Sequence, residues 1–344
     1  MKQRSSHHIL GIIFVIIFLL CGASTFTGCA NDATVATQKI ADSLDIMTGC
    51  KYNCIIGLSP DGTRVAVWYP GSLQVFETSN GKLVSEFKNN PQDFPDHCEF
   101  SVDNKRFLLS SNYSATVVYD VSQATANILL TLPSGTDAHL FDDGTKIIAG
   151  GAKGSNPPSL TIYSIPNGNV LTELHPKNFY NGGFGLGFLR AENYILYGTE
   201  HSECVLWSIS TDKEVSRYYV QSIAVDLLFS EEGQTLTYNS QNGVFPIYDT
   251  RTGKIISIPD LHNYSGGVHA QLVVTKDFIY AGKFLDIYHT LLAVQVLNIA
   301  DGSVALSKQL PDSVSFFQIA ASRQQNCVAV LLTNGLVRLW RIDL

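Results

Sequence analysis

One pattern recurs along this chain: a strand-like apolar run ends in an aromatic or large apolar residue that is followed by a polar residue. The pattern returns at intervals of 41 to 49 residues. A four-stranded propeller blade recurs about every 40 to 50 residues, so this period predicts an all-β chain built from repeated blades. The seven pairs are Phe76-Glu77, Tyr119-Asp120, Tyr163-Ser164, Trp207-Ser208, Tyr248-Asp249, Leu297-Asn298 and Trp340-Arg341.

The turns expected of consecutive hairpins recur along the copies of the pattern. In the first copy, Asp61-Gly62 and Asn80-Gly81 separate apolar runs of five to seven residues. Such pairs favour tight hairpin turns, because these turns need a positive φ that Gly and Asn tolerate. We therefore expect four antiparallel strands in each of seven blades. The strands of the first copy are expected at 54–59, 64–68, 72–76 and 82–87.

The last copy is one strand short. Its strands are expected at 314–320, 327–332 and 336–342, and residues 38–47 can supply the fourth. The predicted fold is therefore a seven-bladed β-propeller of four-stranded blades, closed by an N-terminal strand that completes the last blade. Such closure protects sheet edges that would otherwise pair with other chains. The apolar spacing of 38–47 also fits a helix, so that alternative stays open.

Residues 40–344 resemble the WD-repeat family and its bacterial YVTN-type relatives. Most copies lack the Gly-His pair of that family, and Leu297 replaces the aromatic residue in the sixth copy. The resemblance therefore implies a propeller in which the family's internal hydrogen bonds among His, Ser or Thr, Trp and Asp are incomplete. The third-strand segments that carry it are Leu206-Trp207-Ser208 and Leu339-Trp340-Arg341, and, with Tyr in place of Trp, Val118-Tyr119-Asp120 and Ile247-Tyr248-Asp249.

The first 28 residues have the order of an export signal. Lys2 and Arg4 precede an apolar run at 9–20, and small residues follow it. The run is shorter than the roughly 20 apolar residues that a membrane span needs. We therefore predict a cleaved signal peptide at 1–28, with an uncleaved anchor as an alternative.

The cleavage site decides how the protein is attached to the cell. Phe26-Thr27-Gly28-Cys29 resembles the bacterial lipobox, whose Cys receives the lipid, although Phe26 stands where Leu, Val or Ile is usual. We predict lipidation of Cys29, a polar tether at 29–39 and a location in the cell envelope, facing the periplasm or the exterior. Ordinary cleavage after Ala23 or Ala30 is the alternative, and it would give a soluble secreted protein.

The cysteines are compatible with export, which permits disulfides. Of the seven cysteines, Cys50 and Cys54 flank a short turn-like segment and are the disulfide candidates. The alternative is that they are two small buried thiols. Cys204 and Cys327 lie inside strand patterns, where burial in the core is expected.

The charge balance disfavours nucleic acid as a partner. The chain has 23 Lys and Arg residues against 30 Asp and Glu residues, a net charge of −7, and no basic stripe. Nucleic acids and anionic lipid surfaces both require clustered Lys and Arg. We therefore expect no nucleic acid partner, and contact with the membrane through the N-terminal lipid only.

Polar residues that enter the first strand of a blade are expected to rim the central channel. Such residues in one funnel can bind a divalent metal or act as acid and base, as in the propeller lactonases that this arrangement resembles. No spacing here fixes a ligand geometry as His-x-x-x-His does, and WD-repeat histidines make internal hydrogen bonds. We therefore predict no metal and no cofactor. The funnel residues are His97, Glu99, Asp137, His139 and His269.

Loop aromatics are the other binding candidates. Phe179 and Tyr180 lie between two Asn residues in a predicted loop, a composition that suits contact with protein or carbohydrate. No nucleophile–base pair or metal motif is present. The sequence therefore favours a monomeric, non-enzymatic protein-interaction scaffold of the cell envelope. The alternatives are a hydrolase of lactonase type that uses the funnel residues, and an envelope binder of glycan or a small ligand.

Overall fold

The structure is a computed structural model in which the chain forms two units, Met1–Thr34 and Val35–Leu344, and the second unit is treated below. Residues 1–42, which include the predicted signal peptide and Cys29, lie outside the described residues. Within the described part, no helix is long and apolar enough to cross a membrane. The described residues are 43–50, 54–90, 95, 97–136, 138–141, 143–150, 159–176, 186–189, 193–199, 203–219, 227–230, 235–238, 246–258, 272–275, 277–284, 291–310, 316–324 and 326–342.

Antiparallel sheets follow one another along the chain, and in most of them the strands are hydrogen-bonded in sequence order. The first three sheets are β2 (Ile55–Leu58), β3 (Arg64–Tyr69), β4 (Gly71–Glu77) and β5 (Leu83–Asn90); β6 (His97–Phe100), β7 (Arg106–Asp120) and β8 (Asn127–Thr136); and β9 (Ala138–Leu140), β10 (Lys146–Gly150), β11 (Leu160–Ser164) and β12 (Val170–Leu174).

The next three sheets each have four strands. They are β13 (Leu186–Leu189), β14 (Tyr194–Gly198), β15 (Glu203–Ser208) and β16 (Lys213–Tyr219); β17 (Leu227–Phe229), β18 (Thr235–Tyr238), β19 (Ile247–Asp249) and β20 (Ile255–Ser257); and β21 (Leu272–Val274), β22 (Phe278–Phe284), β23 (Leu291–Asn298) and β24 (Val304–Gln309). The last sheet is β25 (Phe316–Ala321), β26 (Cys327–Leu332) and β27 (Leu336–Arg341), with β1 (Ser43–Met47) beside β27.

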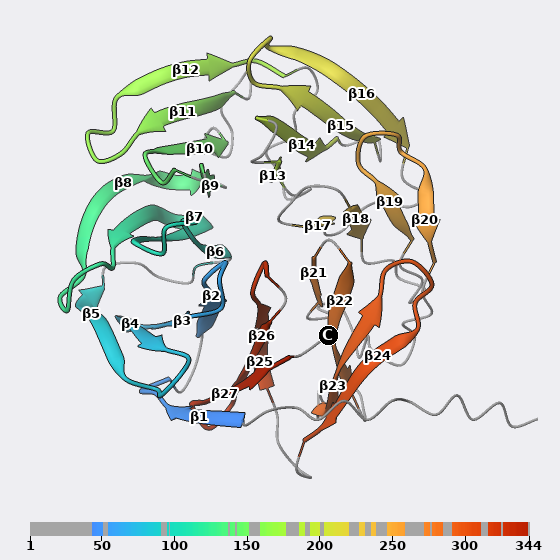
Figure 1. Cartoon of the computed structure of the whole chain (residues 1–344). Helices are drawn as coiled ribbons and strands as arrows, with labels where there is room; N and C mark the ends of the chain where they lie inside the picture. Colours follow the sequence, from blue (N-terminus) through green and yellow to red (C-terminus); the bar gives the residue numbers. More distant parts are fainter. Residues whose placement is uncertain are drawn as a thin grey trace, which may run out of the picture. The chain divides into compact units, whose positions relative to one another are not determined.

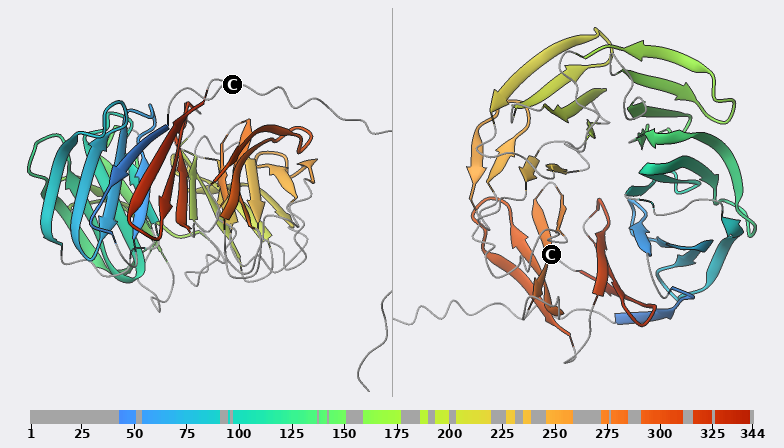
Figure 2. Two further views of the ribbon diagram at one scale, coloured as in Figure 1. Left: turned by 90° about the horizontal axis from the view of Figure 1, so that it is seen from below. Right: turned by 180° about the vertical axis from the view of Figure 1, so that it is seen from behind.

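The sheets surround a common centre. The first strand of each sheet lies innermost in Figure 1, and each of these strands contacts the first strand of the next sheet, with β25 contacting β2. Figure 2 shows the same ring from behind. An all-β propeller with four-stranded blades is thus confirmed. The described residues form six four-stranded sheets, and β6, β7 and β8 form a sheet of three elements.

In each four-stranded sheet, the recurring aromatic or large apolar position lies near the end of the third strand. Phe76, Trp207 and Trp340, for example, lie in β4, β15 and β27. These side chains are buried, and they belong to apolar clusters that join one sheet to its neighbour. The repeat is therefore a packing position: it supplies the large side chain that fills the space between two adjacent sheets.

The turns have the backbone conformation that the sequence predicts. Gly62 and Gly81 have φ values of 71° and 72°, and Asn104, Asn193 and Asp212 have φ values of 58°, 53° and 49°. Short polar side chains tolerate this left-handed region, whereas β-branched side chains do not. The two hairpin turns of the repeat are therefore set by residue type.

The buried tryptophans differ in whether their indole N–H has a hydrogen-bond partner. The indole Nε1 atoms of Trp68 and Trp340 are buried without a hydrogen-bond partner, while that of Trp207 donates to Asp212 Oδ1 at 3.0 Å. Only Trp207 and Trp340 occupy the recurring third-strand position, and of these two the indole hydrogen bond is present at Trp207 and lacking at Trp340. Burial of these large rings is the contribution that remains.

The ring closes through β1, which pairs antiparallel with β27 from Ser43 opposite Trp340 to Met47 opposite Leu336. This excludes a helix at 43–47, and residues 38–42 of the predicted strand lie outside the described residues. Asp45 lies opposite Arg338, and both carboxylate oxygens accept hydrogen bonds from the guanidinium at 2.7 Å.

The ion pair across this junction depends on pH. The Arg338 hydrogen bonds hold the pKa of Asp45 below its ordinary value, although burial opposes the shift. A lowered carboxyl pKa adds stability at pH values above the unfolded-state pKa of about 4, and this stability is lost as the pH falls through the folded-state pKa. Because Asp45 is partly exposed, solvent limits the contribution to less than about 1 kcal/mol.

Adjacent residues of β1 provide a direct test of closure. Ile46 is 5% exposed and packs between the first and last sheets, whereas Met47 is 68% exposed. We expect Ile46→Ala to lower the free energy of unfolding by about 2 to 4 kcal/mol, because it leaves a cavity in the closing sheet. We expect Met47→Ala to lower it by less than about 0.5 kcal/mol. Urea unfolding followed by tryptophan fluorescence measures both, and equal effects would contradict closure through this strand.

Candidate functional site

Three of the predicted funnel residues meet between the innermost strands of two neighbouring sheets. His97 and Glu99 lie on β6, and His139 lies on β9. Glu99 Oε2 is 3.3 Å from His139 Nδ1 and 3.5 Å from His97 Nε2. The two imidazole ring centroids are 4.8 Å apart, with 58° between the ring planes. We call these three residues the inner-rim cluster.

The alternation of β6 explains why His97 and Glu99 act together. Cys98 and Phe100 pack into the apolar cluster shared with the first sheet, and Cys98 Sγ donates to the Ile56 carbonyl at 3.2 Å. Side chains two residues apart share a face of a strand. His97 and Glu99 therefore share the other face of β6, and β6 contacts β9.

The three side chains of the inner-rim cluster differ in solvent exposure. The side chain of Glu99 is 8% exposed, that of His139 14% and that of His97 35%. Glu99 Oε1 accepts a short hydrogen bond from the backbone N–H of Leu140, which fixes one carboxylate oxygen. Oε2 then lies beside the two imidazoles. A carboxylate this buried requires such hydrogen bonds or a positive partner.

The remaining predicted site residues are not placed. Asp137, His269, Phe179 and Tyr180 lie outside the described residues. The structure thus brings together three of the five funnel residues. It also adds the Leu140 amide, which sequence inspection cannot single out because every residue other than proline carries a backbone N–H.

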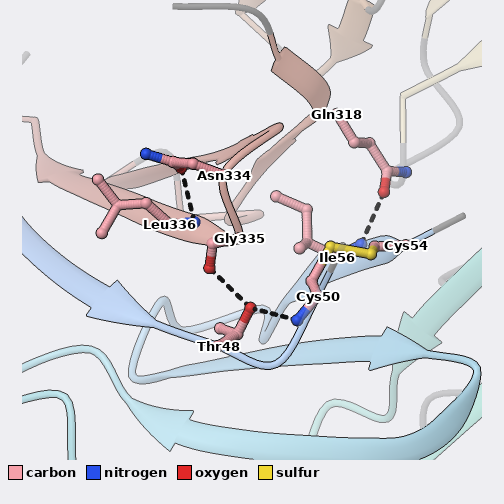
Figure 3. Close-up of a disulfide and its surroundings, with 8 residues drawn as sticks. All are labelled: Thr48, Cys50, Cys54, Ile56, Gln318, Asn334, Gly335 and Leu336. Atoms are coloured by element: carbon pink, nitrogen blue, oxygen red, sulfur yellow. Dashed lines mark hydrogen bonds between the residues drawn. A yellow bond between two sulfur atoms is a disulfide. The ribbon is translucent and has the colours of Figure 1, made fainter. Parts of the chain in front are cut away.

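The structure joins Cys50 and Cys54 in a disulfide with a Cα–Cα distance of 6.1 Å (Figure 3). The disulfide lies on a segment that is tied to the last sheet. Cys50 N–H donates to Thr48 Oγ1 at 3.2 Å, and that hydroxyl donates to the Gly335 carbonyl at 2.7 Å. On the far side of the disulfide, Ile56 N–H donates to Gln318 Oε1 at 2.6 Å. The described residues on both sides of the disulfide are therefore hydrogen-bonded to the last sheet.

Cys98, Cys204 and Cys327 remain thiols. Burial raises the pKa of Cys204 and of Cys327 to about 12, so both stay protonated at neutral pH. A protonated, buried thiol is a poor nucleophile and a poor metal ligand. These two cysteines therefore belong to the core, as their strand patterns predict.

The structure also has a cavity that the sequence did not predict. It measures about 680 Å³ and lies between the first and last sheets, beside Asp61, Arg64, Asn326 and Arg341. The Asp61 carboxylate accepts hydrogen bonds from Ser59, Thr63 and Asn104, and the last of these belongs to the neighbouring sheet. Asp61 therefore shapes a turn and joins two sheets, which leaves the inner-rim cluster as the stronger candidate site.

No protein-family model matches this chain, and no curated protein matches it. Among solved structures, the chain is similar to the β-propeller domain of Cps50 (Swd1) from Myceliophteria thermophila. The TM-score is 0.65 at 12% sequence identity, and the match covers 88% of this chain and 100% of that domain. At this identity the similarity concerns the fold.

Substitution of Gly335 tests how closely the last sheet packs against Cys50 of the disulfide. Its φ is 82°, and an added Cβ would collide with the Cys50 carbonyl oxygen, whereas Gly71 has a φ of 88° and nothing within 4 Å of such a Cβ. We expect Gly71→Ala to destabilise by about 1 to 2 kcal/mol through the backbone alone. We expect Gly335→Ala to destabilise by about 1 to 3 kcal/mol more, through the collision. Thermal unfolding compares the two, and equal shifts would show that the contact is not tight.

Proposed function

We propose that this protein is a non-enzymatic protein-interaction scaffold of the cell envelope, held at the membrane by a lipid on Cys29. The fold supports the first part of the proposal, because a closed ring of sheets presents many loops and outer strands on a rigid body. The N-terminal sequence supports the second part, because an export signal precedes a lipobox-like Cys29.

We also propose that the propeller has seven complete blades. The sheet of β6, β7 and β8 supplies the seventh, because β7 spans 15 residues and its two ends meet: Val121 N–H donates to the Lys105 carbonyl at 2.8 Å. The first sheet has the same bond at the equivalent place, from Thr78 N–H to Thr63 at 2.9 Å. On this proposal, β7 contains both middle strands of a blade, joined by a turn near 112–114.

The observation that carries the scaffold proposal is the apolar surface of three outer strands. β12, β16 and β20 are the outermost strands of consecutive sheets, and they lie along one part of the ring in Figure 1. Solvent-exposed apolar side chains on outer strands are suited to burial against a partner protein. The exposed side chains are Val170 and Leu171 of β12, Val215 of β16, and Ile255 and Ile256 of β20.

Partner capture tests this surface. We expect cross-linking of intact cells followed by mass spectrometry to place a protein partner on β12, β16 or β20. Val215→Asp should reduce partner recovery about tenfold or more, because it puts a charge into a buried apolar contact. Leu83→Asp is the matched control, since Leu83 is 42% exposed and Val215 is 50% exposed, each near the start of an outer strand. Equal partner recovery with the two variants would show that the apolar surface of β12, β16 and β20 does not bind the partner.

Metabolic labelling tests the anchor. A fatty-acid probe should label the wild-type chain, and Cys29→Ala should abolish the label. An unlabelled wild-type chain would favour ordinary signal cleavage. That result would leave the partner experiment intact, so the two parts of the proposal can fail separately.

A hydrolase of lactonase type is the second candidate. The observation that favours it is the meeting of His97, Glu99 and His139 at the inner rim, since such groups can activate water. Turnover of lactones or esters by the purified chain would favour this candidate over the scaffold.

A further inference from the structure

We propose that the inner-rim cluster of His97, Glu99 and His139 is a binding site for one divalent transition-metal ion, with Zn²⁺ as the preferred ion. This goes beyond the scaffold function, which needs no metal. The site lies between two blades and would join their innermost strands.

The donor set selects the class of ion. Two imidazole nitrogens and one carboxylate oxygen can face one point, with all three ligand atoms within 4.8 Å of one another. Zn²⁺ binds such sets in sites with three protein ligands, and related sets bind other first-row dications. Mg²⁺ and Ca²⁺ prefer oxygen ligands, so a site with two imidazoles disfavours them.

The distances agree with a tetrahedral ion. Bonds of about 2.0 to 2.1 Å at tetrahedral angles separate neighbouring ligand atoms by about 3.3 to 3.4 Å. Glu99 Oε2 lies 3.3 Å from His139 Nδ1 and 3.5 Å from His97 Nε2. Two of the three distances between ligand atoms thus match a tetrahedral zinc site. A small rotation of the imidazoles would bring the third distance, between the two imidazole nitrogens, to the same value. His97 is the most exposed of the three, so it has the most room to turn.

The surroundings hold the central ligand. The Leu140 N–H donates to Glu99 Oε1 and leaves Oε2 directed to the histidines, which is the outer-shell support that metal-binding carboxylates receive in other proteins. A dication would also neutralise the negative charge of a side chain that is only 8% exposed. The partial exposure of His97 gives the ion a path from solvent and a position for a water ligand.

Zinc titration of the full chain tests the proposal. After removal of metal with a chelator, isothermal titration calorimetry with ZnCl₂ should give one site per chain. Co²⁺ in place of Zn²⁺ should give the visible absorption bands of a four- or five-coordinate ion. His97→Ala, His139→Ala and Glu99→Gln should each weaken zinc binding by at least about 100-fold, since even outer-shell changes weaken it about 10- to 100-fold.

The matched control is His175→Ala, because His175 is exposed and follows β12, away from the inner-rim cluster. This variant should bind zinc as the wild type does. Circular dichroism and thermal unfolding without metal establish that each variant is folded. If His139→Ala does not fold, His97→Gln decides the question, because His97 is the most exposed ligand.

Two results would overturn the proposal: a wild-type chain that binds no zinc, or zinc binding that is equal in wild type, His97→Gln and Glu99→Gln. Either would show that the cluster is a hydrogen-bonded His–Glu–His network that holds two blades together without metal. Neither result would bear on the scaffold function, whose test uses the outer strands.

Discussion

The pairing of β1 with β27 is the contact on which the ring depends. The other sheets are each built from strands that are consecutive in the sequence. The last sheet lacks its outer strand until β1, from the other end of the folded unit, pairs with β27. The register places Ile46 in the core between the first and last sheets, and it places Asp45 opposite Arg338, which donates hydrogen bonds to its carboxylate. Burial of Ile46 stabilises the junction much more than the partly exposed Asp45–Arg338 ion pair does. The ion pair therefore serves mainly to favour the correct register of β1 against β27.

Much of the fold could be predicted because the residues that determine it recur in each copy of the repeat. Gly and Asn mark the turns, and one large side chain marks the packing position near the end of each third strand. The first-copy strands expected at 64–68 and 72–76 correspond to β3 and β4, with shifts of one residue at their ends. The same reasoning did not foresee that β7 would run as one long element, because the pattern gives the strands but not how sharply the chain bends between them.

The inner-rim cluster was harder to predict, since its parts come from two blades. His97 and Glu99 share a face by simple alternation, which the sequence reveals. His139 follows His97 by 42 residues, about one repeat, so both stand near the start of an innermost strand. Metal-ligand spacings describe ligands on one local segment, and none exists here. The blade period was the available signal, because it brings equivalent positions of adjacent blades to the same edge of the channel.

The shared last sheet also has a consequence for the order of events when the chain folds. Ribosomes synthesise residues 43–47 before residues 336–341, so the strand that closes the ring must wait until β27 has been made. Contacts of such long sequence separation form slowly. Until β1 and β27 have paired, both strands carry unpaired backbone groups that are open to strands from other molecules. We therefore expect this architecture to be prone to domain-swapped dimers, in which one molecule contributes β1 to another.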